Sequence, residues 1–262
     1  MASAVPEHTQ ADHRIRMEWG PTGAEAVGSG TAYAVVIDIL SFTTTLTVAV
    51  ERGMRVWPHR WRDESAAAYA ESMAAVLAVG RLEGEKDATE RVRPAVSLSP
   101  AAMNQVDGVE RVVLPSPNGS TISALLAGTG ARVLGASLRN ATAVARWIAA
   151  RATPAESVGI IAAGERWPDG SLRPAVEDLW GAGAVVHALL DAGVPPDDLS
   201  PEAWVAADSY ELVAPRLAER LRRCASGQEL IGRGYAEDVE IAAEHDASGV
   251  VPLLCDGAFV AG

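Results

Sequence analysis

Short apolar segments alternate with segments of helical pattern along most of the chain. Continuous apolar runs are typical of strands that are buried on both faces of a parallel sheet. Strand-like segments occupy residues 34–40, 54–58, 112–114, 131–136 and 157–163. Helical patterns occupy residues 41–51, 122–126, 141–152 and 174–190. This alternation predicts an α/β fold in which helices cover both faces of a mostly parallel sheet.

The first thirty residues carry weaker signals. Residues 14–19 alternate between polar and apolar side chains, which predicts a half-exposed strand at a sheet edge, and the glycine-rich residues 20–30 predict a loop. Residues 1–12 contain neither an apolar core nor a run of basic residues, so we expect a loose tail and no signal peptide or membrane segment. Residues 13–262 are then expected to form a single domain.

Two features stand out near the C-terminus. Ser226 and Glu229 have the spacing of a capping box, in which each side chain bonds to the backbone N–H of the other residue. The last apolar segments, 250–254 and 258–260, flank Asp256–Gly257. An Asp-Gly pair favours the tight turn of a β-hairpin, so we expect the chain to end in one.

The amino-acid composition limits the kinds of molecule that the protein is expected to bind. Hydrophobic residues make up 48% of the chain and aromatic residues only 5%, so the core is expected to consist mainly of Ala, Val, Leu and Ile. The 34 acidic residues outnumber the 22 basic ones, which argues against nucleic acid or an anionic membrane as a partner. An anionic substrate would therefore need local positive charge from a metal ion, arginines or helix ends. Cys224 and Cys255 fit no zinc or redox spacing, and we expect reduced thiols in a cytoplasmic protein.

Asp38 is the charged residue within the apolar run 34–40. A carboxylate near the carboxyl end of a buried strand costs free energy unless it is paired or bound to a metal ion. Ligand sites of open α/β sheets lie at this end of the strands. The hydroxyl side chains that would open the next helix belong to Ser41, Thr43, Thr44 and Thr45. The segment predicts either a functional carboxylate or a residue that only caps a turn.

A second polar junction lies between the apolar run 112–114 and the helical pattern that follows. Pro117 ends the strand because it has no N–H for the ladder, and Gly119 permits a sharp turn next to Asn118. Hydroxyl groups and the N-terminus of the following helix would face the same point; the hydroxyls are those of Ser116, Ser120 and Thr121. Such a turn suits phosphate or another small anion, and an ordinary capped turn is the alternative.

Several short segments, each weak alone, occur in an order and spacing that resemble the ComB family, the 2-phosphosulfolactate phosphatases. They lie at residues 35–40, 43–45, 83–85, 99–100, 118–120, 135–137, 140–141, 163–164, 177–178, 181–183, 226–230, 238–239 and 250–252. The resemblance implies a three-layer α/β/α fold with a mostly parallel or mixed sheet. It also implies a magnesium-dependent phosphoric monoester hydrolase that converts 2-phospho-3-sulfolactate to 3-sulfolactate and phosphate, a reaction of coenzyme M biosynthesis.

Within this resemblance, catalytic roles fall on Asp38, Glu85 and Asn118. We expect Mg²⁺ to be held by Asp38, Glu85 and one or both of Glu177 and Asp178, although adjacent acids in the first turn of a helix also stabilise its dipole. The residues expected to bind phosphate or the rest of the substrate are Ser41, Thr43, Thr44, Lys86, Ser99, Ser116, Gly119, Ser120, Thr121, Asn140 and Arg166. The attacking group is either water or a carboxylate such as Asp38.

The sequence departs from the family pattern at three places. Ser41 stands where the family has an arginine, Lys86 replaces another arginine, and Leu98 replaces an asparagine. Lysine keeps the charge but lacks the planar fork with which arginine binds phosphate. The sequence therefore also allows a catalytically weakened relative that binds a small anionic metabolite. A homodimer is compatible with an enzyme of this class.

Overall fold

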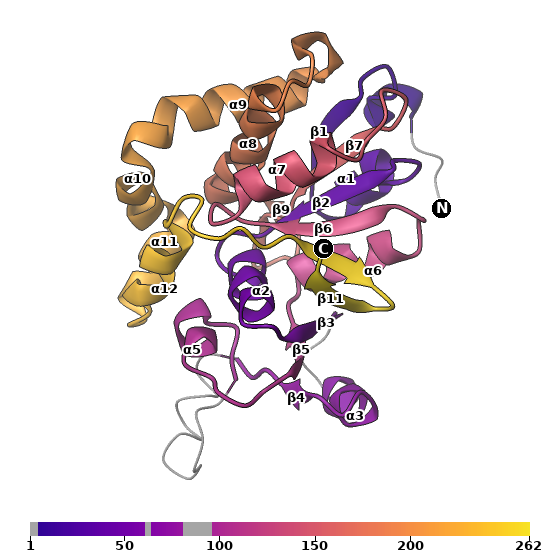
Figure 1. The fold of residues 1–262 in the computed structure, drawn as a ribbon. Coiled ribbons are helices and arrows are strands. Elements are labelled where there is room, and N and C mark those ends of the chain that lie inside the picture. The colour runs from indigo at the N-terminus through magenta and orange to yellow at the C-terminus, as the bar shows by residue number, and fades with distance from the viewer. Residues whose placement is uncertain (1–4, 61–63, 81–95) are drawn as a thin grey trace.

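A computed structural model describes residues 5–60, 64–80 and 96–262. Strands and helices alternate along the chain and form the α/β fold shown in Figure 1. The main sheet has nine strands in the order β1-β7-β2-β6-β10-β11-β3-β5-β4. They are β1 (Ile15–Trp19), β2 (Tyr33–Ile37), β3 (Arg55–His59), β4 (Val76–Leu77), β5 (Arg111–Pro115), β6 (Arg132–Ala136), β7 (Val158–Ala162), β10 (Pro252–Cys255) and β11 (Ala258–Ala261).

The sheet is mixed. Strand β2 pairs in parallel with β6 and β7, and β3 pairs in parallel with β5. The hairpin β10–β11 is inserted between β6 and β3. Its strand β10 runs antiparallel to β6, and its strand β11 runs antiparallel to β3. Its turn is formed by Asp256 (φ 49°) and Gly257 (φ 80°), and positive φ at both positions is what an Asp-Gly hairpin loop requires. The predicted hairpin is therefore confirmed, and it joins the two parallel parts of the sheet.

Helices cover both faces of this sheet. The longer ones are α2 (Phe42–Glu51), α3 (Glu64–Ser72), α6 (Gly119–Ala127), α7 (Ala141–Ala149), α8 (Val176–Asp191) and α9 (Pro201–Val213). The shorter ones are α1 (Gly20–Gly23), α5 (Pro100–Asn104), α10 (Leu217–Arg223), α11 (Ala225–Gly232) and α12 (Ala236–Ala242). No helix in the described ranges combines the length and the apolar character that a membrane crossing requires.

Strand β2 shows how the layers are built. Val35 and Ile37 belong to one hydrophobic core, which includes residues of α7, α8 and α9. Ala34 and Val36 belong to a second core, which includes residues of α2 and α6. Because successive side chains of a strand point to opposite faces, the two cores are the two sides of a three-layer α/β/α arrangement. Figure 1 shows α7, α8 and α9 grouped together on one side.

The predicted edge strand is confirmed as β1, but the loop predicted after it is wrong. Residues 20–30 contain α1 and a π-helix, Ala24–Gly28. Ala24 and Val27 are fully buried in the second core and hold this segment against the sheet. The glycine content suggested a loop, and tertiary packing overrides that local preference.

The described part of the N-terminal tail is attached to the edge strand. Pro6–Thr9 forms a 3-10 turn. The Gln10 side-chain amide donates to the Met17 carbonyl oxygen at 2.8 Å and accepts from the Met17 N–H at 3.1 Å. Gln10 thus supplies to β1 the pair of hydrogen bonds that a further strand would supply, so residues 5–12 are not a loose tail.

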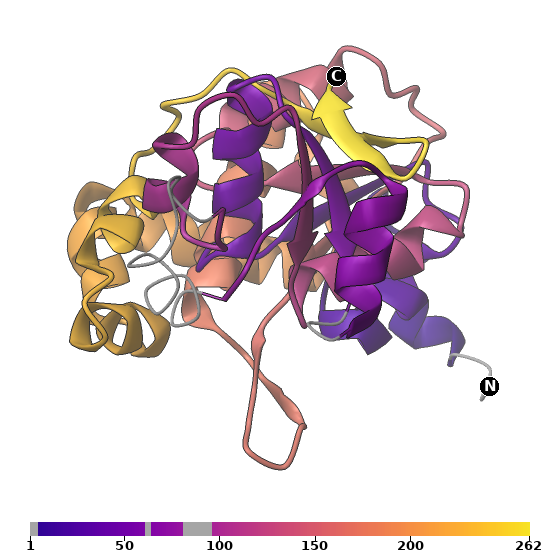
Figure 2. The ribbon, with the colours of Figure 1, turned by 90° about the horizontal axis from the view of Figure 1, so that it is seen from below.

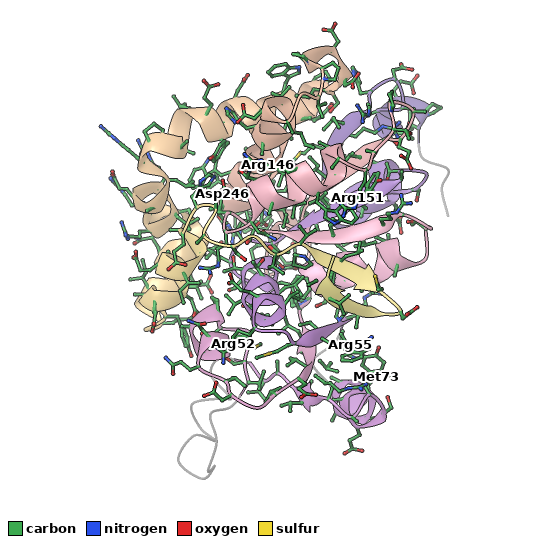
Figure 3. All side chains as sticks on the ribbon, in the orientation of Figure 1. Arg52, Arg55, Met73, Arg146, Arg151 and Asp246 are labelled. Atoms are coloured by element: carbon green, nitrogen blue, oxygen red, sulfur yellow. The ribbon has the colours of Figure 1, made fainter. Side chains whose placement is uncertain are left out.

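Asp246, on the segment that precedes β10, caps α7 (Figure 3). Its carboxylate accepts from the Thr142 N–H at 2.9 Å and from the Thr142 hydroxyl at 2.6 Å. The C-terminal segment therefore fixes the start of α7 as well as the centre of the sheet.

Close packing of α8 against α9 depends on Gly183. A Cβ atom at this position would lie 2.0 Å from the carbonyl oxygen of Ala206 in α9. We expect Gly183→Ala to lower the free energy of unfolding by about 1–3 kcal/mol, because the helices must move apart. Urea unfolding followed by circular dichroism measures this change.

Gly232→Ala is the matched control for that variant. Gly232 is the last residue of α11, and nothing lies within 4 Å of the position its Cβ would take. The control should change the free energy of unfolding by less than about 1 kcal/mol. Equal destabilisation of the two variants would contradict this account of the α8–α9 contact.

Candidate active site

A pocket lies where the carboxyl ends of β2 and β5 approach α11. Its cavity volume is about 160 Å³. The residues that line it are Asp38, Leu40, Ser41, Leu98, Ser116, Pro117, Asn118, Glu165, Ser226, Glu229, Leu230 and Arg233. The peptide bond between Leu40 and Ser41 is cis. The two polar junctions identified in the sequence, after β2 and after β5, therefore form parts of the same pocket.

Asp38 connects the two junctions and is only 6% exposed. Its Oδ1 accepts from the Phe42 N–H at 3.1 Å, and its Oδ2 accepts from the Gly119 N–H at 2.9 Å. A Cβ atom on Gly119 would lie 2.3 Å from Cδ1 of Phe42 and 2.8 Å from Oδ2 of Asp38. The carboxylate is thus fixed at the N-termini of α2 and α6, where both helix dipoles favour negative charge.

Asp178 holds the segments that follow β2 and β7 against α8. Its Oδ1 accepts from the Ile39 N–H at 2.8 Å, and its Oδ2 accepts from the Gly164 N–H at 2.8 Å. Burial raises the pKa of Asp178 well above its usual range, and repulsion from Asp38 and Glu177 adds to this rise. Both oxygens of this predicted metal ligand are therefore engaged by backbone N–H groups.

Glu177 is buried in the first turn of α8, and its charge acts on Cys224. Burial raises the pKa of the Cys224 thiol to about 12, and Glu177 adds to the rise. Cys224 is the N-cap of α11, and its Sγ accepts from the Gly227 N–H at 3.3 Å. The capping box predicted for Ser226 and Glu229 is therefore wrong, because the thiol caps the helix instead. Cys224 and Cys255 are both free thiols, as expected.

Glu165 is a pocket residue that sequence reasoning missed. It begins the small hairpin β8–β9 (Glu165–Arg166 and Leu172–Arg173), whose loop extends away from the rest of the molecule (Figure 2). Its Oε2 accepts from Nδ2 of Asn118 at 3.0 Å. Burial raises the pKa of Glu165 to about 7 and repulsion from Asp38 adds to the rise, while the Asn118 hydrogen bond and Arg173 oppose it. Glu165 directly follows residues 163–164, one of the segments that carry the family resemblance, and this position is the sequence signal that identifies it as a candidate.

The raised pKa of Glu165 makes the stability of the metal-free protein depend on pH. Between pH 4.5 and about 7 the folded protein keeps a proton on Glu165 that the unfolded chain releases, so the free energy of unfolding falls as the pH rises. The shift sets an upper limit of about 3 kcal/mol on this loss. We expect Glu165→Gln to flatten the pH dependence measured by urea unfolding in EDTA.

Part of the slope should remain in that variant, because the pKa of Asp178 is raised in the same direction. Glu211→Gln, on the exposed side of α9, is the control and should keep the slope of the wild type. A slope that is the same in the Glu165 variant and in the wild type would show that folding does not raise the pKa of Glu165.

The predicted phosphate-binding residues of the two junctions divide into two groups. Ser41, Ser116 and Asn118 line the pocket, and Gly119 donates its N–H to Asp38. The other hydroxyls are buried and donate to backbone carbonyl oxygens within the junctions: Thr43 to Asp38, Thr44 to Ile39, and Ser120 to Leu114. These hydroxyls, with the buried Thr121, shape the junctions and do not line the pocket.

Three further residues predicted to bind substrate do not line the pocket. Ser99 is the N-cap of α5 and donates to the Asp238 carboxylate at 2.5 Å. Asn140 accepts from the Ser137 N–H at 2.8 Å and donates to the Val250 carbonyl oxygen at 3.0 Å. Arg166 is exposed and donates to the Gly170 carbonyl oxygen within the β8–β9 hairpin. The structure thus places these side chains in a helix cap, in turns and in contacts between distant segments, away from the pocket lining.

The pocket contains oxygen donors that fit Mg²⁺, although they do not form a complete site. Within residues 5–60, 64–80 and 96–262, no group of three or more His, Cys, Asp or Glu side chains is placed to hold a metal ion. Asp38 and Glu165 line the pocket. The predicted ligand Glu85 and the predicted phosphate-binding residue Lys86 lie outside the described residues. Because Mg²⁺ commonly uses one or two carboxylates together with water and substrate phosphate, the donors present fit this ion.

The fold and the pocket define an α/β protein with a pocket at the carboxyl ends of β2 and β5. A family model described as 2-phosphosulpholactate phosphatase matches residues 23–257. The chain therefore belongs to the 2-phosphosulpholactate phosphatase family, which confirms the resemblance found in its motifs.

Relatives from three organisms support this membership. A protein of Deinococcus radiodurans named probable 2-phosphosulfolactate phosphatase is 30% identical over 86% of this chain and 88% of its own length. A protein of the same name from Thermus thermophilus is 31% identical over 84% of this chain and 86% of its own length. The 2-phosphosulfolactate phosphatase of Methanothermobacter thermautotrophicus is 28% identical over 87% of this chain and 89% of its own length.

Proposed function

We propose that this protein is a phosphatase that hydrolyses 2-phospho-3-sulfolactate to 3-sulfolactate and phosphate. The observation that carries the proposal is the family match over residues 23–257, because it spans both polar junctions and the pocket between them. The meeting of Asp38 with Asn118 and Gly119 supports it, since these residues come from junctions far apart in the sequence.

The turn after β5 is the proposed position of the phosphate group. Ser116 and Asn118 line the pocket there, and α6 begins at Gly119. The first N–H groups of a helix and its dipole favour a phosphate at this end. Ser41 reaches the same pocket from the turn after β2 and offers a further hydroxyl to the substrate. These groups would orient the phosphate and stabilise negative charge as the ester bond breaks.

We infer that the activity requires Mg²⁺, which Asp38 and Glu165 would hold. Asp38 and Glu165 are two of the three carboxylates that line this small pocket, and their charge repels an anionic substrate, so a cation is needed to offset it. When bound, Mg²⁺ supplies charge that polarises a phosphoryl group toward attack. Glu85 and Glu177 are further candidates from the sequence; Glu177 is buried in α8, and Glu85 lies outside the described residues.

Phosphate release from three compounds tests the proposal: 2-phospho-3-sulfolactate, 2-phospholactate and p-nitrophenyl phosphate, each in Mg²⁺ and in EDTA. We expect release that depends on Mg²⁺ and is fastest for 2-phospho-3-sulfolactate. Absence of release from all three, together with saturable binding of phosphate, would show that the protein is an anion-binding relative instead. Phosphate release that is unchanged in EDTA would show that the activity does not require Mg²⁺, while the protein would still be a phosphatase.

A further inference from the structure

The pocket is rich in acidic side chains and poor in basic ones. Asp38, Glu165 and Glu229 line it, and Arg233 is the only basic side chain among the described residues that do so. The proposed substrate carries a phosphate, a sulfonate and a carboxylate. Anionic groups of this kind gain most from charge-assisted hydrogen bonds, so the position of Arg233 decides which of them it can serve.

Arg233 lies at the exposed end of the pocket. It is the C-cap residue of α11, and its guanidinium lies 2.7 Å from Oε1 of Glu229, one turn earlier on the same helix. The side chains of Arg233 and Glu229 are 57% and 52% exposed, whereas Asp38 and Ser116 are 6% and 3% exposed. An exposed pair of this kind contributes little stability, so Arg233 can exchange Glu229 for another anion at small cost.

Arg173 does not duplicate this role. Its guanidinium donates to Oγ of Ser226 at 3.2 Å and lies 5.9 Å from the ring centroid of Trp167. It does not line the pocket. Among the basic residues that the structure describes, Arg233 is therefore the one that lines the pocket.

We propose that Arg233 determines substrate specificity by binding the sulfonate group. The inference rests on the proposed function, in which the phosphate occupies the buried end of the pocket beside Ser116 and Asn118. The sulfonate is attached to the carbon next to the phosphate-bearing one, and it is the anionic group furthest from phosphorus. It therefore extends toward the mouth, where the planar guanidinium of Arg233 leaves Glu229 and donates several N–H groups to the sulfonate oxygens.

Steady-state kinetics of Arg233→Ala with two substrates tests this role. For 2-phospho-3-sulfolactate, KM should rise roughly 10- to 100-fold with little change in kcat, because a charge-assisted contact to a non-reacting group is lost. For 2-phospholactate, which has no sulfonate, KM should change less than about 3-fold. Arg233→Lys should fall between the wild type and the Ala variant, since lysine keeps the charge and loses the planar fork.

Arg223→Ala is the matched control, because Arg223 pairs with Glu219 at the same spacing on α10 and does not line this pocket. It should leave both KM values unchanged. Equal increases in KM for the two substrates in Arg233→Ala would overturn the sulfonate assignment. Unchanged KM for both substrates would show that Arg233 does not contact the bound substrate.

Binding of 3-sulfolactate, measured by calorimetry, separates this inference from the proposed function. Arg233→Ala should bind the compound at least about 10-fold more weakly than the wild type, and this result would support sulfonate recognition even in a protein without turnover. Equal affinity of the variant and the wild type would overturn the inference even if phosphatase activity is confirmed.

Discussion

Asp38→Asn is expected to reduce the rate of phosphate release by at least about 100-fold while the protein stays folded. Asp38 is the carboxylate at which the two junctions meet, and it is a proposed ligand of Mg²⁺. Asparagine has nearly the same shape, but it carries no charge for the cation. The variant therefore removes the negative charge of the side chain while keeping nearly the same side-chain volume. Phosphate release at saturating substrate and Mg²⁺ measures the effect.

The same change also weakens the structure to a limited extent. The carboxylate accepts from two backbone N–H groups, of Phe42 and Gly119, and an amide must turn its NH₂ group toward one of them. We expect a loss of about 1–3 kcal/mol in the free energy of unfolding. Asp208→Asn, at an exposed position of α9, is the control and should change neither property. Turnover like that of the wild type in Asp38→Asn would exclude Asp38 from the reaction.

Gly119→Ala is expected to impair both activity and stability. The added methyl group would overlap the ring of Phe42 and press on the carboxylate of Asp38, at 2.3 Å from Cδ1 and 2.8 Å from Oδ2. Neither neighbour can move freely, because Phe42 is fully buried and the Asp38 carboxylate accepts a hydrogen bond from the N–H of Gly119. We expect a loss of about 1–3 kcal/mol in the free energy of unfolding and at least about a 10-fold loss of kcat, since Asp38 is displaced.

Gly128→Ala is the control at the other end of the same helix. Gly128 is the C-cap of α6, and a Cβ atom there would make only an ordinary contact, 3.8 Å from the Leu125 carbonyl oxygen. This variant should retain full activity and a stability within about 1 kcal/mol of the wild type. Normal kcat in Gly119→Ala would show that the position of Asp38 against α6 does not matter for the reaction.

The local parts of the site follow from the sequence. An apolar run that contains Asp38 near its end and a turn that contains Pro117 and Gly119 each predict a strand, a polar junction and a helix, and the structure contains both. The approach of these two junctions does not follow from the sequence. Across the hairpin β10–β11 the strand direction reverses, so β5 runs antiparallel to β2, and the rule that carboxyl ends of parallel strands share one edge does not apply to this pair. The Asp256–Gly257 hairpin follows from turn chemistry alone.

The parts that depend on tertiary packing do not follow from the sequence. Glu165 and Arg233 reach the pocket from the β8–β9 hairpin and the end of α11. Apart from the position of Glu165 after the family segment 163–164, no local pattern separates them from other acids and arginines of the chain. Ser99 and Asn140 show the opposite problem. Their residue types suit a ligand, but the same groups satisfy helix caps and backbone carbonyl oxygens, which is the commoner use of such side chains.

The most direct test of the central claim is a crystal structure of the protein with Mg²⁺ and phosphate. We expect the metal ion bound to Asp38 and Glu165, and the phosphate in contact with that ion and with Ser116 and Asn118 at the start of α6. Phosphate bound elsewhere on the molecule, or Mg²⁺ without contact to Asp38, would contradict the proposed active site.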